Sequence, residues 1–266
     1  MIRPIFCNSA HVAGPERFLL KGGRLRWLRL PVRYGLIRHP VEGPVLIDTG
    51  YTAHSVTAPG RSLGLRLYGR LLRPILIAEG QPDAFLARHG LTPADITRVI
   101  VTHFHVDHVS GLRLFPKARF TASRAACTRL ANRSRWANLH RAAFPELLPP
   151  NFAARLDAVE DAPLAPQGRD IFRDGSVLAL DLPGHADGHF GLLFPGGRPL
   201  VYGTDTQWLR DALAPGRRPG LPMRLFAESP AALAPSTDLL HRLRDEGAEV
   251  MLCHDPALTA FDEALP

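Results

Sequence analysis

Histidine and aspartate side chains are concentrated in one short segment, Thr102–His108, with the sequence THFHVDH. In an extended chain, side chains two positions apart point the same way, so His103 and His105 can hold one ion. Asp107 and His108 come just after them and can face a second ion. Imidazole nitrogens with carboxylate oxygens suit zinc and similar divalent metals. Buried together without a metal, these groups would lack partners at high cost, so the segment predicts a metal site.

The elements around this cluster can be inferred from the sequence pattern. Arg98–Thr102 is a β-branched strand that runs straight into the histidines. The preceding segment Gln81–His89 indicates a helix, with Pro82 in its first turn and Gly90 just past its end. The cluster therefore lies at the carboxyl end of a strand.

The rest of the chain alternates short strands with helical segments. Mostly helix is expected over residues 120–161, and another helix over 236–246. This order predicts one domain over residues 1–266, built of mixed α/β layers. The further strands that we expect are Met1–Phe6, Leu25–Ile37, Val45–Ile47, Val177–Leu182, His189–Phe194, Pro199–Tyr202 and Ala248–Leu252.

The composition is that of a folded chain without a membrane span. Of the 266 residues, 45% are hydrophobic and 21% are charged, which allows a sizeable core. No apolar run approaches the ~18 residues that a transmembrane helix needs. The three cysteines, Cys7, Cys127 and Cys253, lie far apart and form no CxxC motif, which suits a reducing compartment. We therefore expect a cytoplasmic protein.

The formal net charge of +7 could indicate a nucleic acid partner. Only Lys21 and Lys117 are lysines, however, and the abundance of Arg, Ala, Leu and Pro is typical of codon bias in a GC-rich genome. Arginines spread over a solvated surface explain the charge better. We therefore expect a small-molecule substrate and no nucleic acid partner.

Three further segments extend the pattern of the histidine cluster. Pro183–His189 has the sequence PGHADGH, Gly203–Asp205 follows a predicted strand, and His254 follows the last predicted strand. With HxHxDH after an apolar strand, these segments resemble the metallo-β-lactamase superfamily along nearly the whole chain. The resemblance implies an α/β fold, namely the αββα sandwich of two mixed β-sheets flanked by helices.

The same resemblance implies a site for two divalent ions with seven ligands. Asp205 would contact both ions, and Asp107 is also assigned a catalytic role. Zn²⁺ is the expected metal, with Fe, Mn or Co as alternatives, and such ions lower the pKa of a bound water toward ~7. The other implied ligands are His103, His105 and His185 for one ion, and Asp107, His108 and His254 for the other.

The segment Asp48-Thr49-Gly50 follows an apolar run and also matches the aspartic protease signature. Protease chemistry needs two such carboxylates that share a proton, and the sequence has no second DTG. In the superfamily that the chain resembles, the corresponding Asp typically orients the metal site. The resemblance therefore implies that Asp48 holds a metal-ligating side chain.

Several hydrolase classes share the implied fold. A class with a Cys ligand is disfavoured, because Asp205 occupies the bridging position and neither Cys127 nor Cys253 fits a ligand position. The length, the spacing from VLIDTG to THFHVDH and the segment Gln81–His103 most resemble the N-acyl homoserine lactonase group. In the implied reaction a hydroxide that bridges the two metals opens the lactone or ester. Alternatives are a phosphotriesterase, a phosphodiesterase or nuclease, and a non-catalytic interaction protein.

Trp208 departs from the lactonase pattern. Lactonases commonly carry a Tyr three residues after the bridging Asp, whereas Trp208 offers only an indole N–H donor. We expect Trp208 and Phe104 to border the substrate.

In the segment 61–78, three arginines lie at helical spacing beside a row of leucines. The arginines are Arg66, Arg70 and Arg73, and the leucines are Leu63, Leu67 and Leu71. An ordinary surface helix would explain this pattern. Related enzymes often place a lid or a dimer contact here, so we expect that role for residues 51–80, with a homodimer as a candidate assembly. A helix lying on a membrane surface is a weaker alternative.

Overall fold

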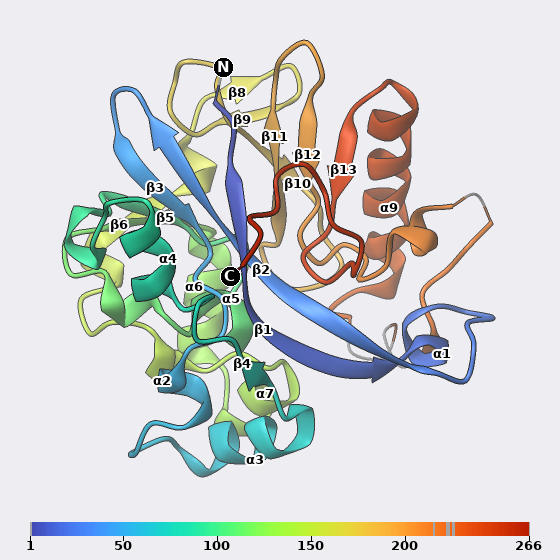
Figure 1. The fold of residues 1–266 in the computed structure, drawn as a ribbon, viewed down its shortest axis with the longest axis horizontal. Coiled ribbons are helices and arrows are strands. Elements are labelled where there is room, and N and C mark those ends of the chain that lie inside the picture. Colours follow the sequence, from blue (N-terminus) through green and yellow to red (C-terminus); the bar gives the residue numbers. More distant parts are fainter. Residues whose placement is uncertain (1, 215, 222–223, 225–226, 266) are drawn as a thin grey trace.

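Two twisted β-sheets pack face to face and carry helices on their outer sides (Figure 1). This computed structural model describes residues 2–265 except 215, 222, 223, 225 and 226. A cluster of buried side chains from both sheets fills the space between them. The arrangement confirms the predicted αββα sandwich of two mixed sheets.

The first sheet has seven strands, and its centre is parallel. β1, β2 and β3 pair antiparallel, whereas β3, β5, β6 and β7 pair parallel. The carboxyl ends of the parallel strands therefore meet at one edge of the sheet. In spatial order the strands are β4 (Ile75–Leu76), β1 (Ile5–Pro15), β2 (Trp27–His39), β3 (Gly43–Ile47), β5 (Arg98–Ile100), β6 (Arg119–Ala122) and β7 (Leu156–Ala158).

The second sheet has six strands and is antiparallel apart from one edge pair. β12 and β13 pair in parallel, so the residues that follow them also emerge at one edge. In spatial order the strands are β13 (Glu249–Met251), β12 (Leu200–Tyr202), β11 (Phe190–Phe194), β10 (Leu178–Asp181), β9 (Gly168–Asp170) and β8 (Leu164–Ala165).

Helices cover the two sheets on opposite sides. In Figure 1, α9 lies beside β13 on one side of the molecule, and the shorter helices surround β5 and β6 on the other. Among the described residues no helix is both long and apolar enough to traverse a bilayer. In the part of the chain that the structure describes, the α-helices are α1 (Glu16–Leu19), α2 (Ala53–Val56), α3 (Leu63–Leu72), α4 (Pro82–Arg88), α5 (Val106–Val109), α6 (Arg124–Asn132), α7 (Arg135–His140) and α9 (Pro230–Asp245).

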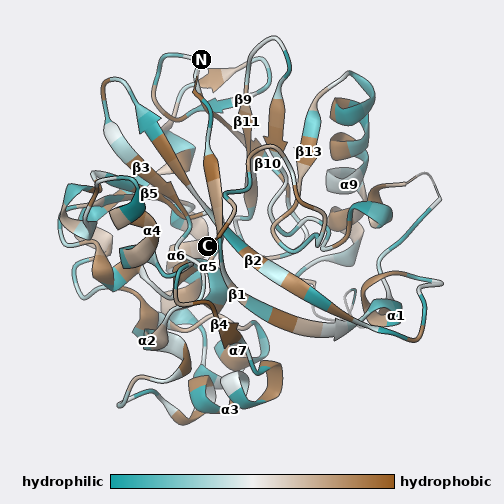
Figure 2. Cartoon of the chain, viewed as in Figure 1, coloured by the Kyte–Doolittle hydropathy of each residue, from teal (hydrophilic) through white to brown (hydrophobic). Residues whose placement is uncertain are grey.

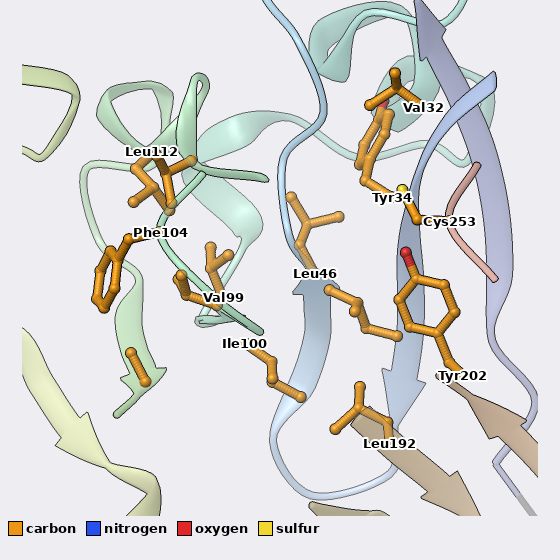
Figure 3. Packing of buried hydrophobic residues seen from close by; sticks show 14 of the residues in the cluster. Val32, Tyr34, Leu46, Val99, Ile100, Phe104, Leu112, Leu192, Tyr202 and Cys253 are labelled. Carbon is orange, nitrogen blue, oxygen red and sulfur yellow. The ribbon is translucent and has the colours of Figure 1, made fainter. Parts of the chain in front are cut away.

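The core between the sheets is apolar and closely packed. Figure 3 shows Val99 and Ile100 of β5 in the same cluster as Leu192 of β11 and Tyr202 of β12. Hydrophobic residues colour β10 and β11 brown in Figure 2, whereas several turns of α9 are hydrophilic. This packing fixes the strand ends from which the polar cluster projects.

Several predicted elements were wrong in extent or type. The first strand runs to Pro15 because it pairs with β2 along its length. Residues 120–161 contain α6, α7 and three short 3-10 helices, as expected, but the strands β6 and β7 at the two ends of that span were missed, and these complete the parallel run. The last helix begins at Pro230, where the Ser229 side chain caps the Ala232 N–H at 3.2 Å, and Pro235 lies inside it.

Candidate metal centre

Four loops bring the polar cluster together. His103 and His105 follow β5, Asp205 follows β12, His254 follows β13, and His185 lies in the β10–β11 connection. Because these strands are parallel neighbours or face each other across the core, residues far apart in sequence meet at one edge of the sandwich.

The first group contains three histidines. Nδ1 of His105 lies 3.1 Å from Nε2 of His103 and 3.0 Å from Nε2 of His185. All three nitrogens lie within 4.8 Å of one another. Such a triangle of ring nitrogens has the size and chemistry of a divalent metal site.

The second group combines carboxylates with two histidines. Oδ2 of Asp107 lies 3.3 Å from Nε2 of His254 and 3.6 Å from Nε2 of His108. Both rings are almost fully buried. The opposite ring nitrogen of His254 donates to the Pro31 carbonyl at 2.8 Å, which directs Nε2 toward the cluster.

Asp205 lies between the two groups. Its Oδ2 is 3.0 Å from Nε2 of His254 and 3.5 Å from Nε2 of His185, while its Oδ1 is 3.5 Å from Nε2 of His108. A single carboxylate therefore contacts rings of both groups. The seven side chains predicted as ligands all lie in this one cluster.

Two buried atoms of the cluster test whether its residues fit a metal. Nε2 of His108 and Oδ1 of Asp205 make no hydrogen bond within the described part of the chain. A buried polar atom left without a partner costs roughly 1–3 kcal/mol. A cation between the groups would satisfy both atoms, so the residues fit a metal centre.

The three histidines of the first group are neutral and can therefore bind a cation through their ring nitrogens. Burial, reinforced by the neighbouring rings, holds the pKa of His103 and His185 well below the usual value. Burial also lowers the pKa of His105 to about 4. Neutral imidazoles keep the lone pairs that metal ligation requires.

In the second group, nearby negative charge raises the histidine pKa values by more than burial lowers them. Burial opposes protonation of His108, but the carboxylates of Asp48, Asp107 and Asp205 raise its pKa well above the usual value. For His254 likewise, burial is outweighed by the nearby Asp205 carboxylate, which raises the pKa of the ring. Without a metal, these two rings hold protons that a bound cation would displace.

Asp48 orients His108 from beneath the cluster. It is fully buried just after β3, at a φ of 57°. Oδ2 of Asp48 accepts from Nδ1 of His108 at 2.8 Å and from the Thr102 hydroxyl at 2.8 Å, while Oδ1 accepts from the Thr102 N–H at 2.9 Å. A proton held on Nδ1 leaves Nε2 of His108 free to face the cluster.

The loop that carries His185 depends on two glycines. Gly184 and Gly188 have φ values of +124° and +59°, a backbone region that L side chains rarely adopt. A Cβ at Gly184 would lie 2.4 Å from the Leu233 nitrogen, and one at Gly188 would lie 2.4 Å from Ser123. The PGHADGH spacing thus lets this loop pack tightly against α9 and the start of α6.

Trp208 and Phe104 occupy different surroundings. The Trp208 ring lies 4.6 Å from the His254 ring between centroids, and its buried Nε1 makes no hydrogen bond to any described residue. Phe104 is buried against Phe152 and lines a small hollow that also includes His105. Trp208 thus presents a free donor near the second group, whereas Phe104 forms an apolar wall beside the first.

Arg33 is a functional neighbour that the sequence analysis missed. It is fully buried in β2 and donates to the carbonyls of Leu252, Cys253 and Asp255 at 3.3, 3.2 and 2.5 Å. Its Nε also pairs with Asp262 at 2.6 Å. Arg33 therefore holds the loop that carries His254. An arginine in the middle of the otherwise uncharged stretch 30–37 was the available signal.

Cys253 lies closer to the second group than the sequence analysis allowed. Its Sγ is within 4.8 Å of ligand atoms of His108, Asp205 and His254. The thiol also contacts the Arg33 carbonyl at 3.5 Å, and Figure 3 shows it beside Tyr202 in the core. The strand that precedes His254 thus places this thiol against the cluster. Cys127 lies apart from it, on α6.

Two tyrosines reach the cluster from the segment 51–80. The Tyr51 hydroxyl donates to the Tyr68 hydroxyl at 3.3 Å, and the Tyr68 ring packs on Phe144 at 5.8 Å. Burial, followed by the nearby Asp107 carboxylate, raises the pKa of Tyr68. The helix α3 that bears Tyr68 is therefore anchored close to the second group.

The chain matches one protein family and is similar in sequence to several known proteins. The sequence profile of the metallo-beta-lactamase superfamily matches residues 27–206, more than half of the chain. The N-acyl homoserine lactonase AttM of Azorhizobium caulinodans is 28% identical over 245 residues, covering 88% of this chain and 86% of that protein. A probable metallo-hydrolase of Mycobacterium tuberculosis is 26% identical over 234 residues, covering 82% of this chain and 72% of that protein.

Solved structures show the same fold. An N-acyl homoserine lactone hydrolase with N-hexanoyl-L-homoserine bound at its catalytic metal centre superposes with a TM-score of 0.72 and 20% identity, covering 96% of this chain and 93% of that one. The dizinc quorum-quenching lactonase AidC superposes with a TM-score of 0.67 and 16% identity, covering 96% and 88% of the two chains. At these identities the superpositions establish the fold alone.

Proposed function

The chain belongs to the metallo-beta-lactamase superfamily and is a metal-dependent hydrolase, and from this premise we propose that it uses two metal ions to open a lactone. The proposed substrate is an N-acyl homoserine lactone, and the proposed role is therefore quorum quenching. Relatives named as N-acyl homoserine lactonases support this class at 27–28% identity. A small-molecule substrate is consistent with a site that is buried at the edge of the sandwich.

The observation that carries the dinuclear proposal is the position of Asp205. Its carboxylate lies 3.0 Å from a ring of the second group and 3.5 Å from a ring of the first. Two ions that shared this carboxylate would each have three further ligands. The first would be held by His103, His105 and His185, and the second by Asp107, His108 and His254.

The donor set indicates which metal would bind. Imidazole nitrogens with carboxylate oxygens suit Zn²⁺, our proposed metal, and also Fe, Mn or Co. When bound, a pair of divalent ions lowers the pKa of water and polarises a carbonyl. The protein supplies the geometry, the dry surroundings and the proton transfers.

Asp107 is proposed to move the proton during ring opening. Although burial raises the pKa of its carboxyl, the neighbouring His108 and His254 lower it overall, so the side chain is ionised and can accept a proton. Its carboxylate would take the proton from the attacking water and return it to the ring oxygen as the ester bond breaks. Water is then added across the bond, and the products are an acid and an alcohol.

Trp208 and Phe104 are proposed to bind the substrate. The unpartnered Nε1–H of Trp208 can donate to a lactone carbonyl near His254, while Phe104 offers apolar surface beside His105. The Trp208→Phe variant keeps an aromatic wall and removes the donor. Because metal ions bound at the site would also polarise the carbonyl, we expect a loss in kcat of about 10-fold, less than the 10²–10³ of a full oxyanion donor.

Residues 51–80 are proposed to form a lid whose outer face contacts a second copy. Tyr68 anchors α3 near Asp107, while Leu63, Leu67 and Leu71 on the same helix are exposed. We also propose a cytoplasmic location, since Cys7, Cys127 and Cys253 are free thiols.

The test of the proposed function is a substrate panel at fixed metal loading. Acyl homoserine lactones, a thioester, a phosphotriester and a generic phosphodiester would be compared by kcat/KM on the same preparation. We expect the lactone to be turned over fastest. Faster phosphodiester cleavage, with steeply salt-dependent nucleic acid binding, would instead place the chain among nucleases.

A further inference from the structure

His189 lies beside the first group but belongs to neither group of ligand candidates. It is almost fully buried, and its ring centroid lies 5.1 Å from that of His103 and 5.4 Å from that of His185. Both of its nitrogens are already engaged. Nδ1 donates to the Leu182 carbonyl at 2.6 Å, and Nε2 accepts from the Thr204 hydroxyl.

The Nδ1 contact closes the loop that carries His185. Leu182 begins this loop and His189 ends it, and the two residues are also joined by the Leu182 N–H to the His189 carbonyl at 3.3 Å. The His189 N–H donates to the Ala186 carbonyl at 3.3 Å. The ring of His189 therefore ties together the base of a loop whose middle supplies a metal-ligand candidate.

The Nε2 contacts reach the turn that carries Asp205. Besides the Thr204 hydroxyl, the Asp205 N–H points at Nε2 from 3.4 Å. Thr204 has a φ of 47°, an unfavourable conformation for a β-branched residue. Such a conformation persists only when its surroundings hold it, and the contact with His189 is one such constraint.

Thr204 also connects this turn to a third loop. Its carbonyl accepts the Cys253 N–H at 2.9 Å, immediately before His254. Three loops that bear His185, Asp205 and His254 are thus joined through His189 and Thr204. No ligand atom is contributed by either residue.

We propose that His189, acting through Thr204, is a positioning residue that fixes the Asp205 carboxylate between the two groups of metal ligands. This inference rests on the proposed dinuclear function and adds a residue to it. Loss of the ring contacts frees the turn at Thr204 to relax toward a negative φ. Asp205 then turns away from His185 and His254, and two ions bound at the site would lose their shared ligand.

The test measures metal binding rather than turnover. Metal-free protein would be titrated with Co²⁺ while its visible spectrum is followed, and Zn²⁺ affinity would be measured by competition with a chelator. Side chains that hold metal ligands typically contribute 10–100-fold to metal affinity. We expect His189→Phe and Thr204→Val each to weaken binding at least 10-fold and to alter the Co²⁺ spectrum.

Two further variants separate positioning from packing. Gln at position 189 places an amide oxygen near the site of Nε2, so His189→Gln should restore much of the affinity that His189→Phe loses. The matched control is His39→Phe, because His39 is also buried but pairs with Asp174 at 2.9 Å on the distant end of β2. We expect His39→Phe to lower the thermal midpoint without changing metal affinity.

The outcomes are decisive in each direction. If His189→Phe does not fold, Thr204→Val removes a single hydroxyl while keeping the side-chain shape and decides the matter. Parental affinity and spectrum in a folded Thr204→Val or His189→Phe variant would overturn the positioning role. A parent protein that binds fewer than two ions would instead overturn the proposed dinuclear function, whatever the variants do.

Discussion

Asp48→Asn tests whether the buried carboxylate fixes the tautomer of His108. Oδ2 accepts from the His108 ring and the Thr102 hydroxyl, and Oδ1 accepts from the Thr102 N–H. An amide replaces one of these acceptors with a donor. If the NH₂ group takes the Oδ2 position, Nδ1 of His108 must become an acceptor. Its proton then moves to Nε2, the atom that faces Asp107 and Asp205, and that atom can no longer ligate a metal.

The alternative orientation of the amide is also costly. If the NH₂ group takes the Oδ1 position, it faces the Thr102 N–H, and a buried backbone donor is left unsatisfied at a cost of about 1–3 kcal/mol. Loss of a side chain that orients a ligand typically lowers metal affinity 10–100-fold, or about 1.4–2.7 kcal/mol. We therefore expect the second ion to bind about 10–100-fold more weakly.

The assay is a chelator-competition titration with Zn²⁺, with the protonation of His108 followed by nitrogen NMR of the Zn²⁺-loaded protein. The control is Asp157→Asn, which removes a half-exposed carboxylate of β7 that pairs with Arg98 and makes no hydrogen bond to Asp48, Thr102 or His108. It should leave both metal sites unchanged. Parental affinity in Asp48→Asn, with the proton still on Nδ1, would refute the reasoning.

Three further predictions concern stability, pH and assembly. Arg33→Met leaves Asp262 buried without its partner, so the free energy of unfolding of the metal-free protein should fall by about 3–5 kcal/mol in urea denaturation. Arg124→Met, which breaks an exposed ion pair, should cost under about 1 kcal/mol. Zn²⁺ affinity should fall as pH falls, because the raised pKa values of His108 and His254 mean that bound protons compete with the metal. An isothermal titration that shows no proton release on Zn²⁺ binding near neutral pH would contradict this. Leu67→Arg, on the exposed face of α3, should shift the parent from dimer to monomer in sedimentation velocity, and a monomeric parent would disprove the proposed contact.

The local features of the site were predictable because they are encoded in adjacent residues. His103, His105, Asp107 and His108 follow one β-branched strand, and their spacing alone indicated metal ligation. The motif around His185 was recognised through its resemblance to the superfamily, and the positive φ values of Gly184 and Gly188 explain why it contains glycines. These signals depend on short-range geometry, which sequence spacing determines directly.

The supporting contacts could not be predicted because they join distant parts of the chain. Arg33 contacts carbonyls about 220 positions away in the sequence. The residues next to Arg33 in the sequence do not indicate which carbonyls these are. Thr204 and His189 are linked only after β10, β11 and β12 have paired. The short strands β6 and β7 were likewise hidden, because their pairing in the first sheet overrides the local helical preference.

The central claim is that two groups of ligands share Asp205, and the metal content of the protein tests it most directly. The chain would be purified without chelator and analysed for bound metal, in parallel with Asp205→Asn. The account predicts close to two divalent ions per parent chain, and a substantial loss of metal together with lactone hydrolysis in the variant. A stable parent that hydrolyses lactones with no bound metal would contradict it, and so would a variant that retains both ions and full activity.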